Sequence, residues 1–141
     1  MEVRFYEREE VSDDRVKFAV IVAFEEEHGI FVRHNNRSTW EIPGGRREPF
    51  ESIEETAERE LYEETGAVSY SIRPVCLYSV KRDENDESFG ALFYATIQER
   101  GPIPAESEIG ECIRSKSLPD ALTYPEIQPF LHKKVTQHLG I

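Results

Sequence analysis

Apolar and polar residues alternate along the chain in blocks whose lengths suit strands and helices. The run from Lys17 to Phe24 is apolar and rich in β-branched residues, which predicts a central strand buried on both faces. The polar stretch Glu25 to Gly29 predicts a turn into a partner strand that begins at Ile30–Val32. Further extended segments are expected at residues 40–42, 71–80 and 89–97, with the polar stretch 81–88 joining the last two.

Two segments carry the pattern of helices. Residues 49–65 predict a helix that ends at Gly66, a residue that tolerates the left-handed conformation of a helix cap. Residues 125–139 predict a second helix, because Leu131, Val135 and Leu139 repeat every four residues. No internal repeat or Pro/Gly/Ser linker divides the chain, so we expect a single domain over residues 1–141. Strands interleaved with two helices favour an α/β/α sandwich with a mixed sheet between the helices.

Composition narrows the class of protein. Hydrophobic residues make up 38% and charged residues 32% of the 141 residues, as in a globular protein. The net charge of −11 repels nucleic-acid backbones, so a duplex-binding module is not expected, although a bound cation can reverse the local sign for a small phosphorylated substrate. No apolar run approaches the roughly 20 residues of a membrane span. Cys76 and Cys112 are expected to be reduced thiols, and the start of the chain lacks the pattern of a signal peptide, so we expect a cytoplasmic protein.

Three glutamates of the first predicted helix are placed unfavourably for a helix without a ligand. Glu60, Glu63 and Glu64 fall within about 100° of one another on a helical wheel and partly overlap the apolar stripe of Ile53, Ala57 and Leu61. Like charges at these spacings repel, and the helix dipole disfavours anions in the last turn. A cation would compensate, and carboxylates with no nearby His or Cys favour Mg²⁺ or Mn²⁺ over zinc. On helix geometry alone, a charged surface is an equally good interpretation.

The residues around this helix form a recognisable motif. Gly45 is followed after five residues by Glu51 and, after seven more, by the run Arg59-Glu60-Leu61-Tyr62-Glu63-Glu64-Thr65-Gly66-Ala67. This resembles the Nudix box, G-x5-E-x7-R-E-U-x-E-E-x-G-U, where U is a bulky aliphatic residue. Ala67 is the one departure, and it affects packing rather than chemistry. The preceding segment Trp40-Glu41-Ile42-Pro43-Gly44-Gly45 also resembles the lead-in of the family, and the likeness is strongest to small MutT-like members.

The resemblance implies roles for individual residues. Glu60 and Glu64 would be the principal metal ligands, Glu63 would ligate directly or through water, and the carbonyl of Gly44 would add a backbone oxygen. Arg59 would orient a glutamate, and Glu51 would brace the loop and the metal site. The implied reaction is an in-line attack of water on phosphorus, with Mg²⁺ as the cofactor and Mn²⁺ as a substitute.

A further carboxylate often assists from a loop beyond the box in this family. Glu108 best resembles that position, with Glu111 as the second choice and a plain acidic loop as the alternative. Among the arginines near the box (Arg33, Arg37, Arg46 and Arg47), one or two are candidates to hold phosphates, and Arg33 and Arg46 are the specific choices. Tyr124 is a candidate contact for a nucleobase. His34 is interpreted as a polar residue at a strand end, and Trp40 as a packing residue.

These observations predict an enzyme that cleaves a phosphoanhydride bond in a small nucleotide. A nucleoside triphosphate, with oxidised purine nucleotides among the candidates, would yield a monophosphate and pyrophosphate. The alternatives are another nucleoside diphosphate derivative, the 5′ end of RNA, or a non-catalytic nucleotide-binding regulator. The sequence predicts no membrane partner and does not name the base, the oligomeric state or the pathway.

Overall fold

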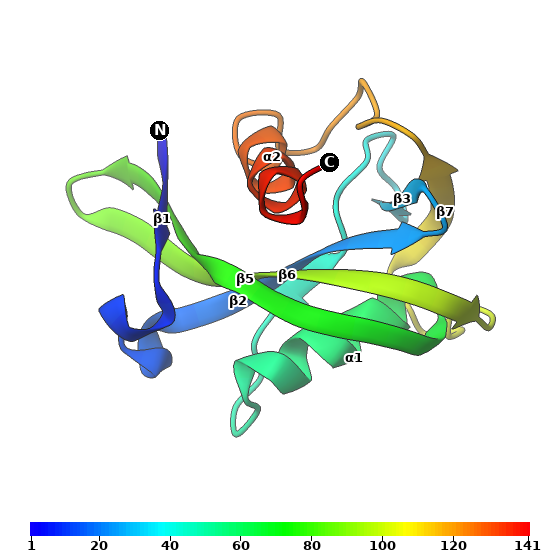
Figure 1. Cartoon of the computed structure of the whole chain (residues 1–141), viewed down its shortest axis with the longest axis horizontal. Coiled ribbons are helices and arrows are strands. Elements are labelled where there is room, and N and C mark those ends of the chain that lie inside the picture. Colours follow the sequence, from blue (N-terminus) through cyan, green and yellow to red (C-terminus); the bar gives the residue numbers. More distant parts are fainter.

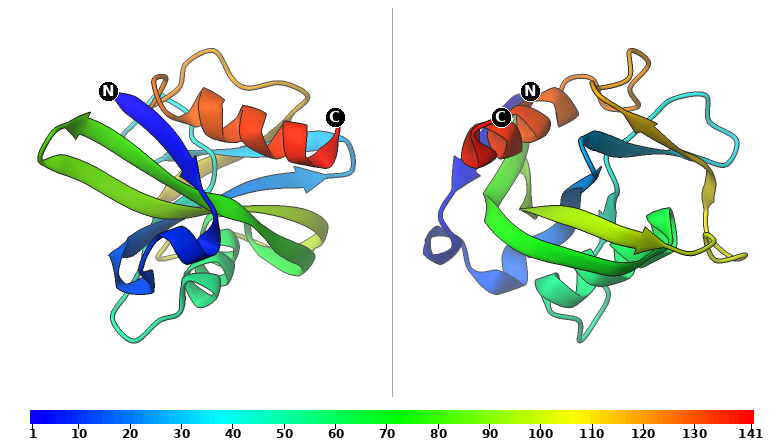
Figure 2. Two further views of the ribbon diagram at one scale, coloured as in Figure 1. Left: turned by 60° about the vertical axis from the view of Figure 1, so that its left-hand side comes forward. Right: turned by 45° about the vertical axis from the view of Figure 1, so that its right-hand side comes forward.

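The computed structural model describes residues 1–141, and it contains one mixed sheet with a helix on each face. The strands are β1 (Glu2–Tyr6), β2 (Val16–Glu25), β3 (His28–His34), β4 (Gly44–Arg46), β5 (Ala67–Asp83), β6 (Asp86–Arg100) and β7 (Ile109–Ser115). The helices are α1 (Ile53–Thr65) and α2 (Gln128–Leu139), and two short 3-10 turns, η1 (Arg8–Glu10) and η2 (Asp13–Arg15), follow β1. Figures 1 and 2 show α1 and α2 on opposite sides of the sheet, which confirms the expected α/β/α sandwich.

Two different strands, β3 and β4, pair with the same edge of β2. Its strand order is β1-β5-β6-β2-β3-β7, and β4 pairs with β2 outside this path. The C-terminal end of β2 pairs with β3, from Ala23 opposite Ile30, whereas its N-terminal half pairs with β4, from Phe18 opposite Arg46. β3 and β4 therefore pair with different ends of β2. The gap between these two strands adjoins a cleft.

Two cores cover the two faces of the sheet. Ile53, Ala57 and Leu61 of α1 pack against Ile21 and its neighbours on one face. On the other face, α2 packs onto a cluster that includes Val20, Val22 and Leu92. Successive β2 residues thus enter opposite cores, as their alternating side-chain directions require. The prediction of a central strand buried on both faces is confirmed.

Helix α1 begins later than the sequence pattern suggested. The prediction of a helix from Pro49 is wrong, because the Ser52 side chain accepts a 3.0 Å hydrogen bond from the N–H of Glu55 and forms a capping box with it. Phe50 has a φ of 68°, which a helix does not allow. The predicted end is confirmed, since Gly66 closes the helix in the left-handed conformation with a φ of 76°.

Other element boundaries also differ from expectation. The polar residues 81–88 are not a loop, because β5 and β6 continue as a hairpin whose turn is only Glu84-Asn85. β1 and β7 were not predicted, and β7 includes part of the segment expected to be an acidic loop. The segment 40–42, expected to be extended, forms only isolated β-bridges to other segments. Helix α2 begins at Gln128 rather than at the predicted Pro125. In each case, pairing or packing with distant residues decides the local structure.

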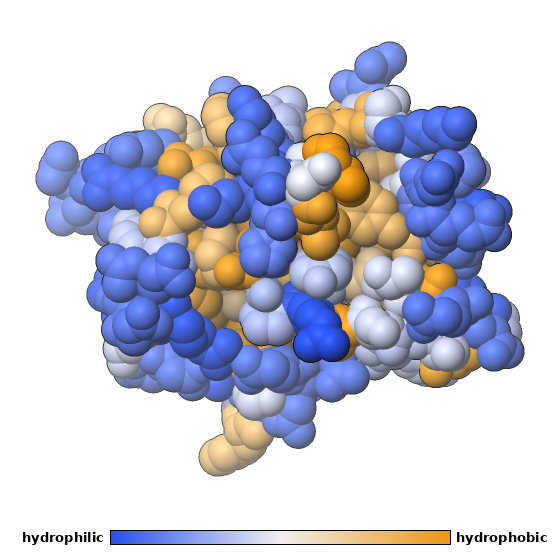
Figure 3. All heavy atoms as spheres, in the orientation of Figure 1, coloured by the Kyte–Doolittle hydropathy of each residue, from blue (hydrophilic) through white to orange (hydrophobic).

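None of the helices is long and apolar enough to cross a membrane. Hydrophilic side chains cover most of the face shown in Figure 3, and apolar residues appear mainly around α2 and the neighbouring part of the sheet.

Candidate functional site

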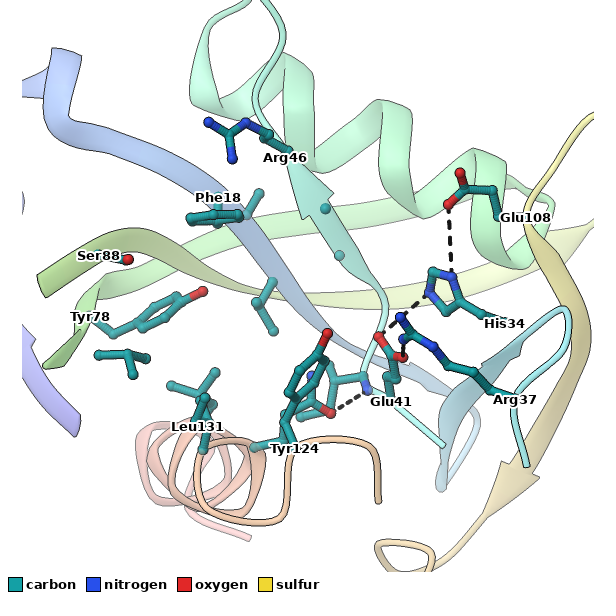
Figure 4. Close-up of a pocket in the computed structure, with 18 of the residues that line it drawn as sticks. Phe18, His34, Arg37, Glu41, Arg46, Tyr78, Ser88, Glu108, Tyr124 and Leu131 are labelled. Atoms are coloured by element: carbon teal, nitrogen blue, oxygen red, sulfur yellow. Dashed lines mark hydrogen bonds and ion pairs between the residues drawn. The ribbon is translucent and has the colours of Figure 1, made fainter. Parts of the chain in front are cut away.

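A cleft of about 380 Å³ lies between β4 and α2. Its walls combine apolar residues, among them Phe18 and Val20 of β2 and Leu131 of α2, with polar and charged ones. Figure 4 shows His34 and Glu108 at one end of the cleft and Tyr78 and Ser88 at the other, with β4 passing between them. A cleft that combines apolar walls with polar groups at defined positions is typical of a small-molecule site.

The two glycines of β4 bring two carboxylates of α1 against the wall of this cleft. The N–H of Gly44 donates a 2.9 Å hydrogen bond to Glu64 Oε1, and Glu64 is only 6% exposed. A Cβ on Gly45 would lie 2.4 Å from the carboxylate carbon of Glu60, so only glycine permits this approach. At Gly44, a Cβ would lie 2.4 Å from the carbonyl oxygen of Ala19. Both glycines are therefore required by the close packing of β4 against α1 and β2.

Burial makes these carboxylates unusual acids. Burial raises the pKa of Glu64 to about 8, and the charges of Glu60, Glu41 and Glu108 add to the increase, while the Gly44 N–H opposes it. Burial also raises the pKa of Glu60, against the opposing effect of Arg59. A bound cation would stabilise the charged forms of both groups.

Arg59 links the carboxylates of the box. Its guanidinium donates two hydrogen bonds to Glu51, of 2.7 and 3.0 Å, and one each to Glu60 at 2.6 Å and Glu63 at 2.9 Å. The hydrogen bonds from Arg59 lower the pKa of Glu51 to about 2. Glu51 also accepts from Thr56 and from the N–H of Glu48, so it anchors the loop before α1 as well as Arg59.

The donors present suit a hard cation. No three histidine, cysteine or carboxylate side chains converge closely enough to hold a metal ion in this arrangement, in which Arg59 donates to Glu60 and Glu63. Glu60, Glu63, Glu64 and the backbone at Gly44 nevertheless offer only oxygen ligands, which Mg²⁺ and Mn²⁺ prefer. The 41% exposed side chain of Glu63 and the cleft beside β4 leave an approach for such an ion.

His34 has a more central place than the sequence suggested. Its Nε2 lies 3.5 Å from Glu41 Oε1 and 3.6 Å from Glu64 Oε2, and its Nδ1 lies 3.8 Å from Glu108 Oε2. The imidazole thus lies among three carboxylates that come from different parts of the chain. Its position at the end of β3 was evident in the sequence, but nothing in the local pattern indicated these neighbours.

The two candidate distal carboxylates lie in different places. Glu108 lines the cleft, and its side chain is 86% exposed. Glu111 lies outside the cleft lining, with Oε1 3.6 Å from Nε of Arg33. The segment is held in place because Ser107 donates to the carbonyl of Glu63 and the N–H of Asn35 donates to the carbonyl of Glu108. The structure therefore brings Glu108, and not Glu111, to the site.

The arginines near the box also divide by location. Arg46 and Arg37 line the cleft, where Arg37 donates to Glu41 at 2.6 Å and Arg46 lies 5.6 Å from the centre of the Phe18 ring. Arg33 is outside the cleft lining and donates to the carbonyl of Arg37. Arg47 braces the loop before α1 through Glu51 and Asp13. Of the two arginines expected to bind substrate, only Arg46 faces the cleft.

The segment before α2 forms one side of the cleft. Tyr124 lines the cleft and is 42% exposed, and Thr123 fixes this segment by a 2.6 Å hydrogen bond to Thr39. Gln128, which sequence reasoning missed, is 6% exposed and accepts a 2.7 Å hydrogen bond from the N–H of Ile42. Trp40 packs against the core beside α2, as expected.

Comparisons with known proteins identify related sequences. Residues 13–139 match the model of the NUDIX domain. A Bacillus subtilis (strain 168) protein described as a "Putative 8-oxo-dGTP diphosphatase" is 33% identical over 78 residues, which is 55% of this chain and 50% of the relative. The chain therefore matches about half the length of that relative.

Solved structures show the same fold. A pyrophosphohydrolase of Bacillus subtilis has a TM-score of 0.78 and 23% identity, with 96% of this chain and 90% of that one covered. The Nudix domain of a Shewanella oneidensis protein, crystallised with ADP-ribose, has a TM-score of 0.68 and 19% identity, with 95% and 94% covered. Because the family model spans nearly the whole chain and every charged position of the box is present, this chain belongs to the Nudix family.

Proposed function

We propose that this protein is a divalent-metal-dependent hydrolase of the phosphoanhydride bond of a nucleoside triphosphate, releasing a nucleoside monophosphate and pyrophosphate. The observation that carries the proposal is the packing of Glu60 and Glu64 against the two glycines of β4 at the wall of the cleft. Buried carboxylates that repel one another are costly unless a cation joins them, and a phosphate chain in the cleft would approach the same ion.

The residues of the chain take distinct parts in this proposal. Glu60, Glu64, Glu63 and the Gly44 carbonyl would hold Mg²⁺, with Mn²⁺ as a substitute, and the ion would supply charge neutralisation at the phosphates. Arg59, fixed by Glu51, holds the glutamates in position. Glu108 is the candidate proton acceptor for the attacking water, because it lines the cleft and no hydrogen bond occupies its carboxylate. Arg46 is the candidate phosphate contact, since no carboxylate pairs with it, and Tyr124 is a candidate contact for the nucleoside.

The size of the cleft supports a compact substrate. A volume of about 380 Å³ is near the lower end of the range for small-molecule sites, which suits one nucleoside better than two. The Bacillus subtilis relative is described as a putative 8-oxo-dGTP diphosphatase, and we propose oxidised purine triphosphates among the first substrates to be tested.

A substrate panel tests this function. Ordinary and oxidised nucleoside triphosphates, ADP-ribose, a sugar nucleotide and a dinucleoside polyphosphate are incubated with the protein and Mg²⁺, and the products are separated by chromatography. We expect the highest kcat/KM with a triphosphate, with pyrophosphate and monophosphate as products. Best turnover of ADP-ribose or a dinucleotide would replace the substrate class, and binding without turnover of any compound would favour a regulator.

A further inference from the structure

The end of the cleft away from His34 and Glu108 contains a hydroxyl without a protein partner, carried by an otherwise buried tyrosine. Tyr78 is only 6% exposed, and its hydroxyl makes no hydrogen bond with the protein. In Figure 4 this hydroxyl points toward the middle of the cleft, below Phe18. No buried side-chain polar atom of the protein lacks a partner, so this hydroxyl is open to the cleft, where water or a ligand that displaces water supplies its partner.

A glycine fixes the position of this hydroxyl. Tyr78 of β5 lies directly opposite Gly90 of β6 in the sheet. A Cβ on Gly90 would lie 2.5 to 2.6 Å from the end of the Tyr78 ring and its hydroxyl oxygen. The ring therefore occupies the space that a side chain at residue 90 would fill, and its hydroxyl is held over the neighbouring strand rather than free to turn.

A second hydroxyl lies at the same end. Ser88 lines the cleft two residues before Gly90, so both residues present the same face of β6, and Ser88 pairs across the strands with Val80. Its side chain also makes no hydrogen bond with the protein, and Figure 4 places it beside Tyr78. Hydroxyls both donate and accept, so the pair can bind a group that carries donors and acceptors on one edge.

The walls at this end restrict the chemical class of that group. Phe18, Val80 and Leu131 surround the hydroxyls with apolar surface, and Arg82 is an exposed residue of the cleft lining. A phosphate placed among the apolar residues would lose its hydration, and a sugar would bury more hydroxyls than two partners can satisfy. A flat, uncharged heteroaromatic ring buries apolar faces and offers a limited polar edge.

We propose that Tyr78 and Ser88 determine the specificity of the site by binding the polar edge of the nucleobase. This inference rests on the proposed function, because it takes the phosphates to lie at the glutamate end and the base at the opposite end. Tyr78 positions its hydroxyl through the contact with Gly90, and Ser88 adds the second hydrogen-bonding group.

Two conservative variants test the proposal. Tyr78→Phe and Ser88→Ala each remove one oxygen, and Tyr94→Phe is the matched control because Tyr94 does not line the cleft. Calorimetry measures the binding of AMP, GMP, CMP, UMP and ribose 5-phosphate to the metal-free proteins, and kcat/KM is measured for the corresponding triphosphates with Mg²⁺. We expect each cleft variant to bind the preferred base roughly tenfold more weakly, which is the effect of losing one hydrogen bond. Binding of ribose 5-phosphate should not change.

Stability separates recognition from folding. Removing an unpartnered hydroxyl should leave the Tm of Tyr78→Phe unchanged or higher, whereas a hydroxyl with a structural role would lower it. Gly90→Ala retains the hydroxyl but displaces the ring, so it should weaken base selectivity in the same way if it folds.

The outcomes distinguish this proposal from the function on which it rests. Base-selective binding that depends on Tyr78 without hydrolysis of any triphosphate would reject the hydrolase function and retain the recognition site. Hydrolysis with an unchanged base preference in both cleft variants would reject the recognition site alone. The recognition site is also rejected if the wild-type protein binds all bases equally well, or if the cleft variants lose affinity for ribose 5-phosphate as much as for the nucleotides. A third contrary result is an Arg82→Gln variant that weakens only substrates with a second phosphate, because phosphates would then lie at this end of the cleft.

Discussion

At the scale of single residues, the position of Glu108 gives a direct prediction about proton transfer. Glu108→Gln should lower kcat by at least about tenfold, because a positioned base contributes 10² to 10⁴-fold and a metal-polarised water would keep part of the rate. Glu106→Gln should leave kcat within about twofold, since Glu106 is exposed and does not line the cleft. Steady-state kinetics at saturating Mg²⁺ measures both variants. A greater loss in Glu111→Gln than in Glu108→Gln would contradict the assignment.

The sequence predicted residues whose role depends on local spacing and missed those whose role depends on distant neighbours. Glu60, Glu64 and Gly66 were recognised because helix periodicity and motif spacing place them. His34 was not, because Glu41, Glu64 and Glu108 reach it from three other segments. Tyr78 resembled an ordinary strand residue, since neither its contact with Gly90 nor the cleft has a local pattern.

At the scale of elements, the start of α1 controls the loop that carries Glu51. Ser52→Ala removes the acceptor of the Glu55 N–H and should lower the free energy of unfolding by roughly 1 kcal/mol. Urea denaturation measures the change. Ser71→Ala is the control, because Ser71 is an exposed strand residue whose side chain makes no hydrogen bond. Equal stability of Ser52→Ala and wild type would show that the cap contributes nothing.

The ends of helices and strands were predictable where neighbouring residues determine them, and not where pairing with distant residues does. Gly66 ends α1 through its own conformational freedom, so its position was predicted correctly. The start of α1 was wrong because the Ser52–Glu55 capping box was overlooked, although both residues are visible in the sequence. β7 could not be predicted from local pattern, because its seven residues are held by pairing with β3, far away in the chain.

At the scale of the whole molecule, the acidic chain places two arginines without carboxylate partners at the cleft. The net charge is −11, yet Arg46 and Arg82 line the cleft without a carboxylate partner. The sheet contributes to this arrangement, because β3 and β4 pair with different parts of β2 and the glycines of β4 contact the glutamates of α1. The fold thus places a buried acidic pair beside the cleft, which is the arrangement that the proposed hydrolysis of a metal-bound nucleotide requires.

The most direct test compares wild type with Glu64→Gln in two measurements, triphosphate turnover with Mg²⁺ and the rise in Tm on adding millimolar Mg²⁺. Glutamine retains an oxygen that accepts from the Gly44 N–H and is never charged, whereas burial raises the pKa of Glu64 to about 8 and so disfavours its charged form; the metal-free variant should therefore be at least as stable as wild type. We expect its turnover to fall by at least about 100-fold and its Mg²⁺-induced rise in Tm to shrink, because the ion binds the native state less tightly. Wild-type turnover by Glu64→Gln, with the same Tm response to Mg²⁺, would contradict the account.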